Sequence, residues 1–172
     1  ERALELMAKL PLRALAVVGT RVPQARSISI TKQILSDLSG SDLVIISGLA
    51  RGIDGAAHRA ALDAGLPTIA VLGSGVDMIY PPEHALLAEK ILHNDGLIIS
   101  EFAPSFTARP GNFIKRNRLI AGWSRALWVV EAGHRSGALN TAKWAREHDR
   151  DCFATPCFPG DQALAGNQQL ID

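Results

Sequence analysis

The chain has 172 residues, of which 47% are hydrophobic and 20% charged, and its formal net charge is +1. This is an ordinary globular balance with enough apolar residues for a single domain, which we expect to span residues 1–172. It excludes a membrane-spanning helix, because no apolar run reaches the roughly 18 residues required, and a protein that coats nucleic acid through bulk positive charge.

Helical and strand patterns alternate along the sequence. In chain order we expect a helix over 1–10, a strand over 14–18, a helix over 27–38, a strand over 43–47, a helix that ends at Ala64, a strand over 68–72, a helix over 83–93, a strand over 97–99, a helix over 112–123, a strand over 126–130, a helix over 138–148 and a strand over 152–154. Residues 1–10 are interpreted as the remnant of an N-terminal helical segment, and residues 158–172 as a C-terminal tail. The residues expected to face inward from the helix over 27–38 are Ile30, Ile34, Leu35 and Leu38.

The predicted strands are apolar on both faces, which is typical of a parallel sheet with helices on both sides. We therefore predict the doubly wound α/β class, with a mostly parallel sheet. In that class ligands bind beyond the carboxyl ends of the strands. Four turns that contain glycine follow predicted strands at this edge, over residues 19–21, 48–52, 73–75 and 133–137.

The turn over residues 48–52 predicts a binding site for an anion. Gly48 and Gly52 allow a ligand to approach the backbone closely, and the N-terminus of the following helix favours negative charge. Arg51 adds a guanidinium suited to phosphate, and Asp54 is placed to cap the helix. A tight turn with a solvated arginine is the alternative. Gly73 and Ser74 are further candidates for the same edge of the sheet.

The densest positive charge lies between residues 109 and 118, a stretch without acidic residues. Cations interleaved with aromatic rings suit a single strand of nucleic acid, whose phosphates pair with the cations and whose bases stack on the rings. The candidates are Phe113, Lys115, Arg116 and Arg118. The alternative is an exposed helix N-terminus with Phe113 in the core. Asn117 could bond a base edge or phosphate, or equally a neighbouring loop.

Other polar residues receive structural interpretations. His58 lies four residues after Asp54, so we expect these two side chains to pair. Glu101 and Glu131 end strands and are expected to orient nearby arginines. Phosphate contact at Ser136 and Gly137, which open a helix, competes with a solvated loop. The tryptophans, expected in the core or at an interface, are Trp123, Trp128 and Trp144.

Motifs for metals, cofactors and catalysis are missing from the sequence. The dinucleotide fingerprint, the P-loop and the nucleophile elbow do not occur. Cys152 and Cys157 are the only cysteines and have no histidine at zinc spacing. We therefore predict no enzyme, no cofactor and no metal. We expect no signal peptide, and a reducing, cytoplasmic location.

Several ordered motifs resemble one known family. They cover residues 47–54 with Ala57 and His58, residues 73–77 with Tyr80 and Pro81, residues 100–102, residues 112–122, and residues 130–132 with 136–139 and 141–142. In these motifs the chain resembles the DNA-processing protein A family, also called DprA or Smf, from Val18 to Ala154.

The resemblance implies an extended Rossmann-like domain that binds and protects single-stranded DNA, forms a homodimer and helps to load the recombinase RecA in natural transformation. It implies no catalytic activity. The family's pocket would map to Arg21, Gly48, Arg51, Phe113, Lys115, Arg116, Asn117, Ser136 and Gly137. Two alternatives stay open. One is a nucleoside-monophosphate phosphoribohydrolase, whose Pro-Gly-Gly-x-Gly-Thr motif is replaced here by residues 136–141; the other is a protein-interaction scaffold.

Overall fold

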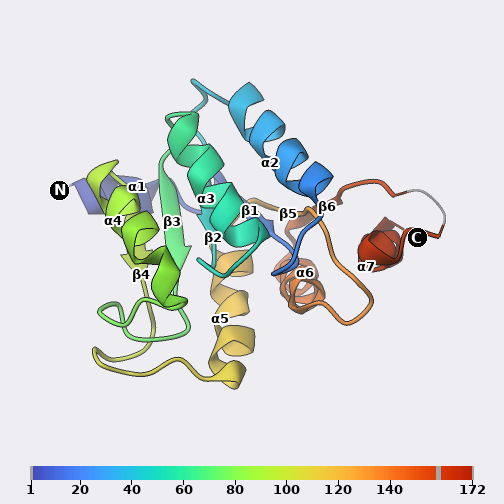
Figure 1. The fold of residues 1–172 in the computed structure, drawn as a ribbon. Coiled ribbons are helices and arrows are strands. Elements are labelled where there is room, and N and C mark those ends of the chain that lie inside the picture. The colour runs from blue at the N-terminus through green and yellow to red at the C-terminus, as the bar shows by residue number, and fades with distance from the viewer. Residues whose placement is uncertain (1, 158–159, 172) are drawn as a thin grey trace.

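The computed structural model describes residues 2–157 and 160–171 (Figure 1). Helices and strands alternate through most of the chain, as the sequence predicts. The elements are α1 (Arg2–Ala8), β1 (Ala14–Val18), α2 (Ala25–Asp37), β2 (Val44–Ser47), α3 (Ile53–Asp63), β3 (Thr68–Val71), the 3-10 helix η1 (Pro82–His84), α4 (Ala85–His93), β4 (Leu97–Ile99), α5 (Pro110–Gly122), β5 (Ala126–Val129), α6 (Gly137–Glu147), β6 (Asp151–Ala154), the 3-10 helix η2 (Gln162–Leu164) and α7 (Ala165–Ile171).

The six strands form one sheet in the order β4-β3-β2-β1-β5-β6, and every pair is parallel. The order runs outward from β1 to β4 on one side and then reverses, with β5 returning to pair with β1. The prediction of a doubly wound α/β fold is confirmed. Because the connections diverge between β1 and β5, the carboxyl ends of these two strands form the crevice where such folds bind ligands.

Alternate side chains of the strands enter two different cores. Ala16 and Val18 of β1 pack with α5 and α6, whereas Val17 packs with α2 and α3. Helix α4 covers the far end of the same face, over β3. Trp128 is buried in the core under α2 and α3, and Trp123 and Trp144 pack against the core on the opposite face, as expected.

The inward face predicted for α2 is confirmed at Leu35, which is fully buried, and at Leu38, which packs against the same core, but not at Ile30 and Ile34. Ile30 and Ile34 are 39% and 38% exposed, while Ser27, Thr31 and Leu35 are buried against α3. The Thr31 hydroxyl donates a 2.7 Å hydrogen bond to the Ser27 carbonyl one turn earlier. A hydroxyl satisfied within its own helix can be buried at little cost, so the buried face takes in Ser27 and Thr31 in place of the predicted Ile30 and Ile34.

The segment predicted as a C-terminal tail contains η2 and α7, whereas residues 158, 159 and 172 of that prediction lie outside the described part of the chain. Leu164 and Asn167 of this segment are buried, and the Asn167 side chain bonds the end of β5. At the other end of the chain, α1 is the expected short helix, and it buries Leu6 in the core that α5 and α6 share.

Candidate functional site

A cleft of about 680 Å³ opens at the carboxyl ends of β1 and β5. Its walls come from the turn after β1, the first half of α5, and the turn that leads into α6. Six of the sequence-predicted site residues line it: Arg21, Phe113, Arg116, Asn117, Ser136 and Gly137. The structure thus gathers these residues at the switch point of the sheet.

The turn after β1 is held against α3 by a glycine. Gly52 has a φ of +74°, and a Cβ there would overlap the carbonyl oxygen of Thr20 and lie 2.8 Å from Arg21 Cα. Only glycine combines this backbone conformation with so close an approach. Gly52 therefore positions Arg21 in the cleft but does not itself line the cleft.

Asp54 does not cap α3, contrary to the prediction. The N-cap is Gly52, and the Asp54 carboxylate accepts hydrogen bonds from the backbone N–H groups of Gly48 (3.1 Å) and Ala50 (3.3 Å). Burial raises the pKa of Asp54, while the opposite charge of Arg116 and these backbone hydrogen bonds act to lower it. The Asp54 carboxylate thus holds the loop before α3, because it accepts from N–H groups of that loop and not from those of the first turn of α3.

Arg116 lies in the floor of the cleft and is only 3% exposed. Its Nη1 donates a 2.8 Å hydrogen bond to the Gly48 carbonyl and a second bond to the Val71 carbonyl. Burial lowers the pKa of Arg116 to about 10, so the side chain still carries its charge at neutral pH. A Cβ on Gly48 would lie 2.6 Å from Arg116 Cζ, so Gly48 leaves room for this guanidinium.

Two aromatic rings form a platform on the α5 side of the cleft. The Phe113 and Tyr80 ring centroids are 5.5 Å apart, and Arg21 Cζ lies 5.5 Å from the Phe113 centroid. Gly73 supports this platform from below, because a Cβ there would lie 2.8 Å from Phe113 Cδ1. Tyr80 was not among the predicted site residues. Its signal was its place directly before Pro81, inside a motif of the family resemblance.

Across the cleft, α6 begins with its N-terminus directed at the same space. The Ser136 hydroxyl caps this helix by accepting from the Ala138 N–H at 3.2 Å. Asn117 donates long hydrogen bonds to the Gly137 carbonyl (3.4 Å) and to Asn140 Oδ1 (3.5 Å). Of the two predicted roles of Asn117, the structure shows the contact with a neighbouring segment. The helix N-terminus adds a partial positive charge to the cleft.

The remaining predicted residues lie outside the cleft. Arg51 forms an exposed ion pair with Glu83 beside a small hollow that Tyr80 and Phe113 also line. Ser74 is buried, and its hydroxyl donates to the Met78 carbonyl at 2.7 Å.

Lys115 and Arg118 occupy a different face of α5 from Phe113. Lys115 Nζ lies 5.6 Å from the Phe102 ring centroid, and Arg118 forms an ion pair with Glu101. The expectation that Glu101 orients an arginine is confirmed. The stretch that reads as one basic cluster in the sequence is therefore divided between two sides of a helix.

Glu131 and His58 have different partners from those predicted. The Glu131 carboxylate accepts from the Gln24 N–H at 3.0 Å, and its carbonyl accepts from the Thr20 N–H at 2.8 Å, so it holds backbone and not an arginine. His58 Nδ1 is 2.8 Å from Thr68 Oγ1 and does not pair with Asp54. Glu131 thus holds the turn after β1, whereas His58 joins α3 to β3.

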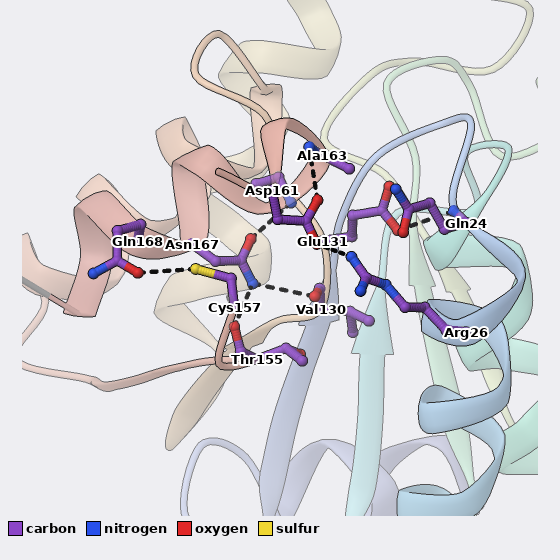
Figure 2. A network of polar contacts seen from close by, with 11 residues as sticks. Gln24, Arg26, Val130, Glu131, Thr155, Cys157, Asp161, Ala163, Asn167 and Gln168 are labelled. Atoms are coloured by element: carbon purple, nitrogen blue, oxygen red, sulfur yellow. Dashed lines mark hydrogen bonds and ion pairs between the residues drawn. The ribbon is translucent and has the colours of Figure 1, made fainter. Parts of the chain in front are cut away.

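A network that sequence reasoning missed holds the turn after β5 (Figure 2). The buried Asn167 side chain accepts from the Ala132 N–H at 2.7 Å and donates to the carbonyls of Val129, Val130 and Thr155 at 3.0 to 3.1 Å. In this way α7 locks the strand end from which one wall of the cleft departs.

Two further features bear on the kind of site. The described residues hold no group of three or more His, Cys, Asp or Glu side chains that could bind a metal ion. Within the same part of the chain, each helix is too short or too polar to cross a bilayer. The cleft offers cations, backbone dipoles and aromatic rings, which are groups for binding.

Comparisons with known proteins agree with this geometry. "Protein Smf" of Synechocystis is 47% identical over 155 residues, which cover 90% of this chain and 39% of that protein. The X-ray structure of DNA processing protein A from Streptococcus pneumoniae superimposes with a TM-score of 0.87 at 40% identity, covering 96% of this chain and 57% of that one.

A second solved structure, described by its single-stranded DNA binding mode, is DNA processing protein A from Helicobacter pylori. It has a TM-score of 0.86 and 30% identity, and the match covers 96% of this chain and 74% of that chain. The chain thus spans only part of the length of these relatives. The model of the family described as DNA recombination-mediator protein A matches residues 5–172, and the chain belongs to this family.

Proposed function

We propose that residues 1–172 act as one DNA-binding domain that holds single-stranded DNA in the cleft between β1 and β5. The observation that carries this proposal is that Arg21, the Phe113 ring and the N-terminus of α6 line one cleft of about 680 Å³. A cation and a helix N-terminus attract phosphate, and an aromatic ring stacks on a base of any sequence. The Helicobacter pylori relative, described as binding single-stranded DNA, supports this choice.

The residues divide into two roles under this proposal. Arg21, Ser136 and Gly137 meet phosphates at the cleft surface, and Phe113 with Tyr80 meets bases. Gly48, Gly52, Gly73 and Ser74 shape the site, and Arg116 and Asn117 hold its floor and wall. Arg51, Lys115 and Arg118 contact the strand where it runs past the cleft, after exchanging their carboxylate or ring partners for phosphate.

The proposal extends to partners and location. The proposal includes that the domain passes its strand to the recombinase RecA and protects incoming DNA during natural transformation, and the family description as a recombination mediator supports it. A homodimer is supported by β6, an outer strand of the sheet whose Phe153 is 56% exposed. Unpaired strand edges with exposed apolar side chains favour association. The free state of both cysteines supports a cytoplasmic location.

The test of the central proposal is a titration of labelled oligo-dT with the protein, read by fluorescence anisotropy at several salt concentrations. The wild-type affinity falls with salt, and Arg21→Ala lowers both the affinity and the salt slope, the latter by about 0.7 for one lost phosphate contact. Arg125→Ala is the control, because Arg125 is an exposed arginine that precedes β5, at the opposite edge of the sheet. Equal behaviour of the two variants would contradict the proposal, and release of adenine from AMP would point to an enzyme instead.

A further inference from the structure

A second groove, of about 540 Å³, lies between α2 and α3 on the other side of the turn that follows β1. Figure 1 shows these two helices side by side on one face of the sheet, and their contact is among the most extensive in the fold. Arg21 lines both this groove and the cleft. The two spaces therefore adjoin at a single residue.

The turn that separates the two spaces is fixed in place. The Thr20 N–H donates to the Glu131 carbonyl and the Gln24 N–H donates to the Glu131 carboxylate, while Gly52 lies against the backbone of Thr20 and Arg21 from the α3 side. A chain that passes from the cleft to the groove thus crosses a rigid edge that carries Arg21.

The charges of the groove suit a polyanion. Three cations line it, Arg21, Lys32 and Arg59, against one acidic residue, Asp63. The ion pairs found among the described residues include none of these three cations, and all three are exposed. In a chain whose formal net charge is only +1, this is a local concentration of positive charge.

Apolar groups alternate with these cations. Val22 is 85% exposed and Ile28 is 44% exposed, and both line the groove beside Pro23. Exposed apolar side chains next to these exposed cations match the alternation of sugar and base with phosphate along a nucleic-acid strand. A protein partner would have to be acidic and apolar in the same narrow alternation, so the strand already assigned to the cleft is the simpler occupant.

We propose that the groove between α2 and α3 is a second binding stretch for the same single strand, with phosphates at Lys32 and Arg59 and with Arg21 as the bridge from the cleft. This inference rests on the proposed function and extends it, since it predicts that nucleotides beyond those in the cleft add affinity. Oligonucleotide length is therefore the variable that separates the groove from the cleft.

The test compares labelled dT oligomers of about 4 and about 16 nucleotides, which bracket common site sizes, on the intact chain. The variant is the double change Lys32→Gln and Arg59→Gln, with Lys32→Gln alone as a milder form. The matched control is the double change Lys90→Gln and Arg125→Gln, which removes the same charge from exposed positions outside both spaces. Circular dichroism melting curves verify that each variant is folded.

We expect the groove variant to bind the longer oligomer about 25-fold more weakly in 0.1 M salt, with a salt slope smaller by about 1.4, since each contact contributes about 0.7. Its affinity for the shorter oligomer and both affinities of the control stay at the wild-type values. An unchanged affinity for the longer oligomer, or an equal loss at both lengths, overturns the inference. Failure of the wild type to bind either oligomer would instead overturn the proposed function.

Discussion

The Arg116 guanidinium donates a 2.8 Å hydrogen bond to the Gly48 carbonyl, which lies 68 positions earlier in the chain. This bond joins α5 to the loop before α3, and the charge of Arg116 faces the buried carboxylate of Asp54, which holds the same loop. A pair of opposite charges below the cleft therefore sets the position of the loop that carries Arg51.

Removing Arg116 leaves Asp54 buried without a compensating charge. Its loss also leaves the Gly48 and Val71 carbonyls without the hydrogen bonds that Arg116 donates, so we expect Arg116→Met to lower the free energy of unfolding by about 1–3 kcal/mol, the usual cost of an unsatisfied buried polar group. The measurement is urea unfolding followed by circular dichroism. Arg118→Met is the control, because the pair of Arg118 and Glu101 lies at the surface and such pairs contribute about 0–1 kcal/mol. Equal losses in the two variants would show that the buried contacts of Arg116 contribute no more than a surface ion pair.

His58 makes stability depend on pH. The Thr68 hydroxyl donates to the Ile45 carbonyl and so accepts from His58 Nδ1, which leaves His58 Nε2 buried without a hydrogen-bond partner. Burial, followed by the nearby charge of His84, lowers the pKa of His58 to about 3 from its ordinary 6.5. Below pH 6.5 the unfolded chain therefore binds a proton that the folded chain does not, and stability falls as the pH falls toward 3.

The expected contribution of His58 is a loss of about 1.4 kcal/mol for each pH unit between about 6 and 4. Urea unfolding of the wild type and of His58→Leu at pH 7, 6, 5 and 4 isolates it, because the other titrating groups contribute to both proteins. The stability curve of the variant is flatter by this amount over that range. Parallel curves for the two proteins would rule out a buried neutral His58.

The strands and their parallel arrangement could be predicted because the signal is local. Runs such as Val44–Ser47 are fully buried, and an apolar run bounded by glycine turns is visible in the sequence alone. The position of the cleft followed from the same pattern, since all carboxyl ends of a parallel sheet meet at one edge.

The division of the basic stretch between two sides of α5 could also have been predicted from the sequence. Phe113, Arg116 and Ile120 recur at the spacing of one helical face, which is the face that α5 turns to the cleft and core. Lys115 and Arg118 lie off that stripe. Charge density alone merged two sides of the helix, whereas helical spacing would have separated them.

The roles of Asp54 and α7 could not be predicted from local pattern. Asp54 satisfies two N–H groups of the preceding loop, and Asn167 satisfies backbone groups up to 38 positions away. Which buried donors and acceptors need a partner depends on the tertiary arrangement. A sequence shows that Asp and Asn are able to supply such bonds but not where the orphaned groups lie.

Asn167 links α7 to the wall of the cleft, so its removal tests that link. Asn167→Ala leaves the buried Ala132 N–H without its hydrogen bond and removes the bonds that Asn167 donates to the strand-end carbonyls, so we expect a loss of about 1–3 kcal/mol in the free energy of unfolding. Gln162→Ala, at an exposed position of η2, is the control. Thermal unfolding gives the comparison, and a variant as stable as this control would show that other contacts hold the turn after β5.

Under the proposed function Phe113 binds DNA through stacking, which does not depend on counterions. Phe113→Leu keeps an apolar side chain over Gly73 and loses the ring, so we expect the affinity for oligo-dT to fall by roughly 5- to 150-fold, from about 1–3 kcal/mol for one base, with the salt slope unchanged. Ile114→Leu, a change without a ring in the same cleft, is the control. Anisotropy titrations at three salt concentrations separate this effect from that of Arg21→Ala, because only the loss of a phosphate contact flattens the slope. A flattened slope in Phe113→Leu would mean that the ring acts by holding Arg21 in place, 5.5 Å from its centroid, and that the base is bound elsewhere.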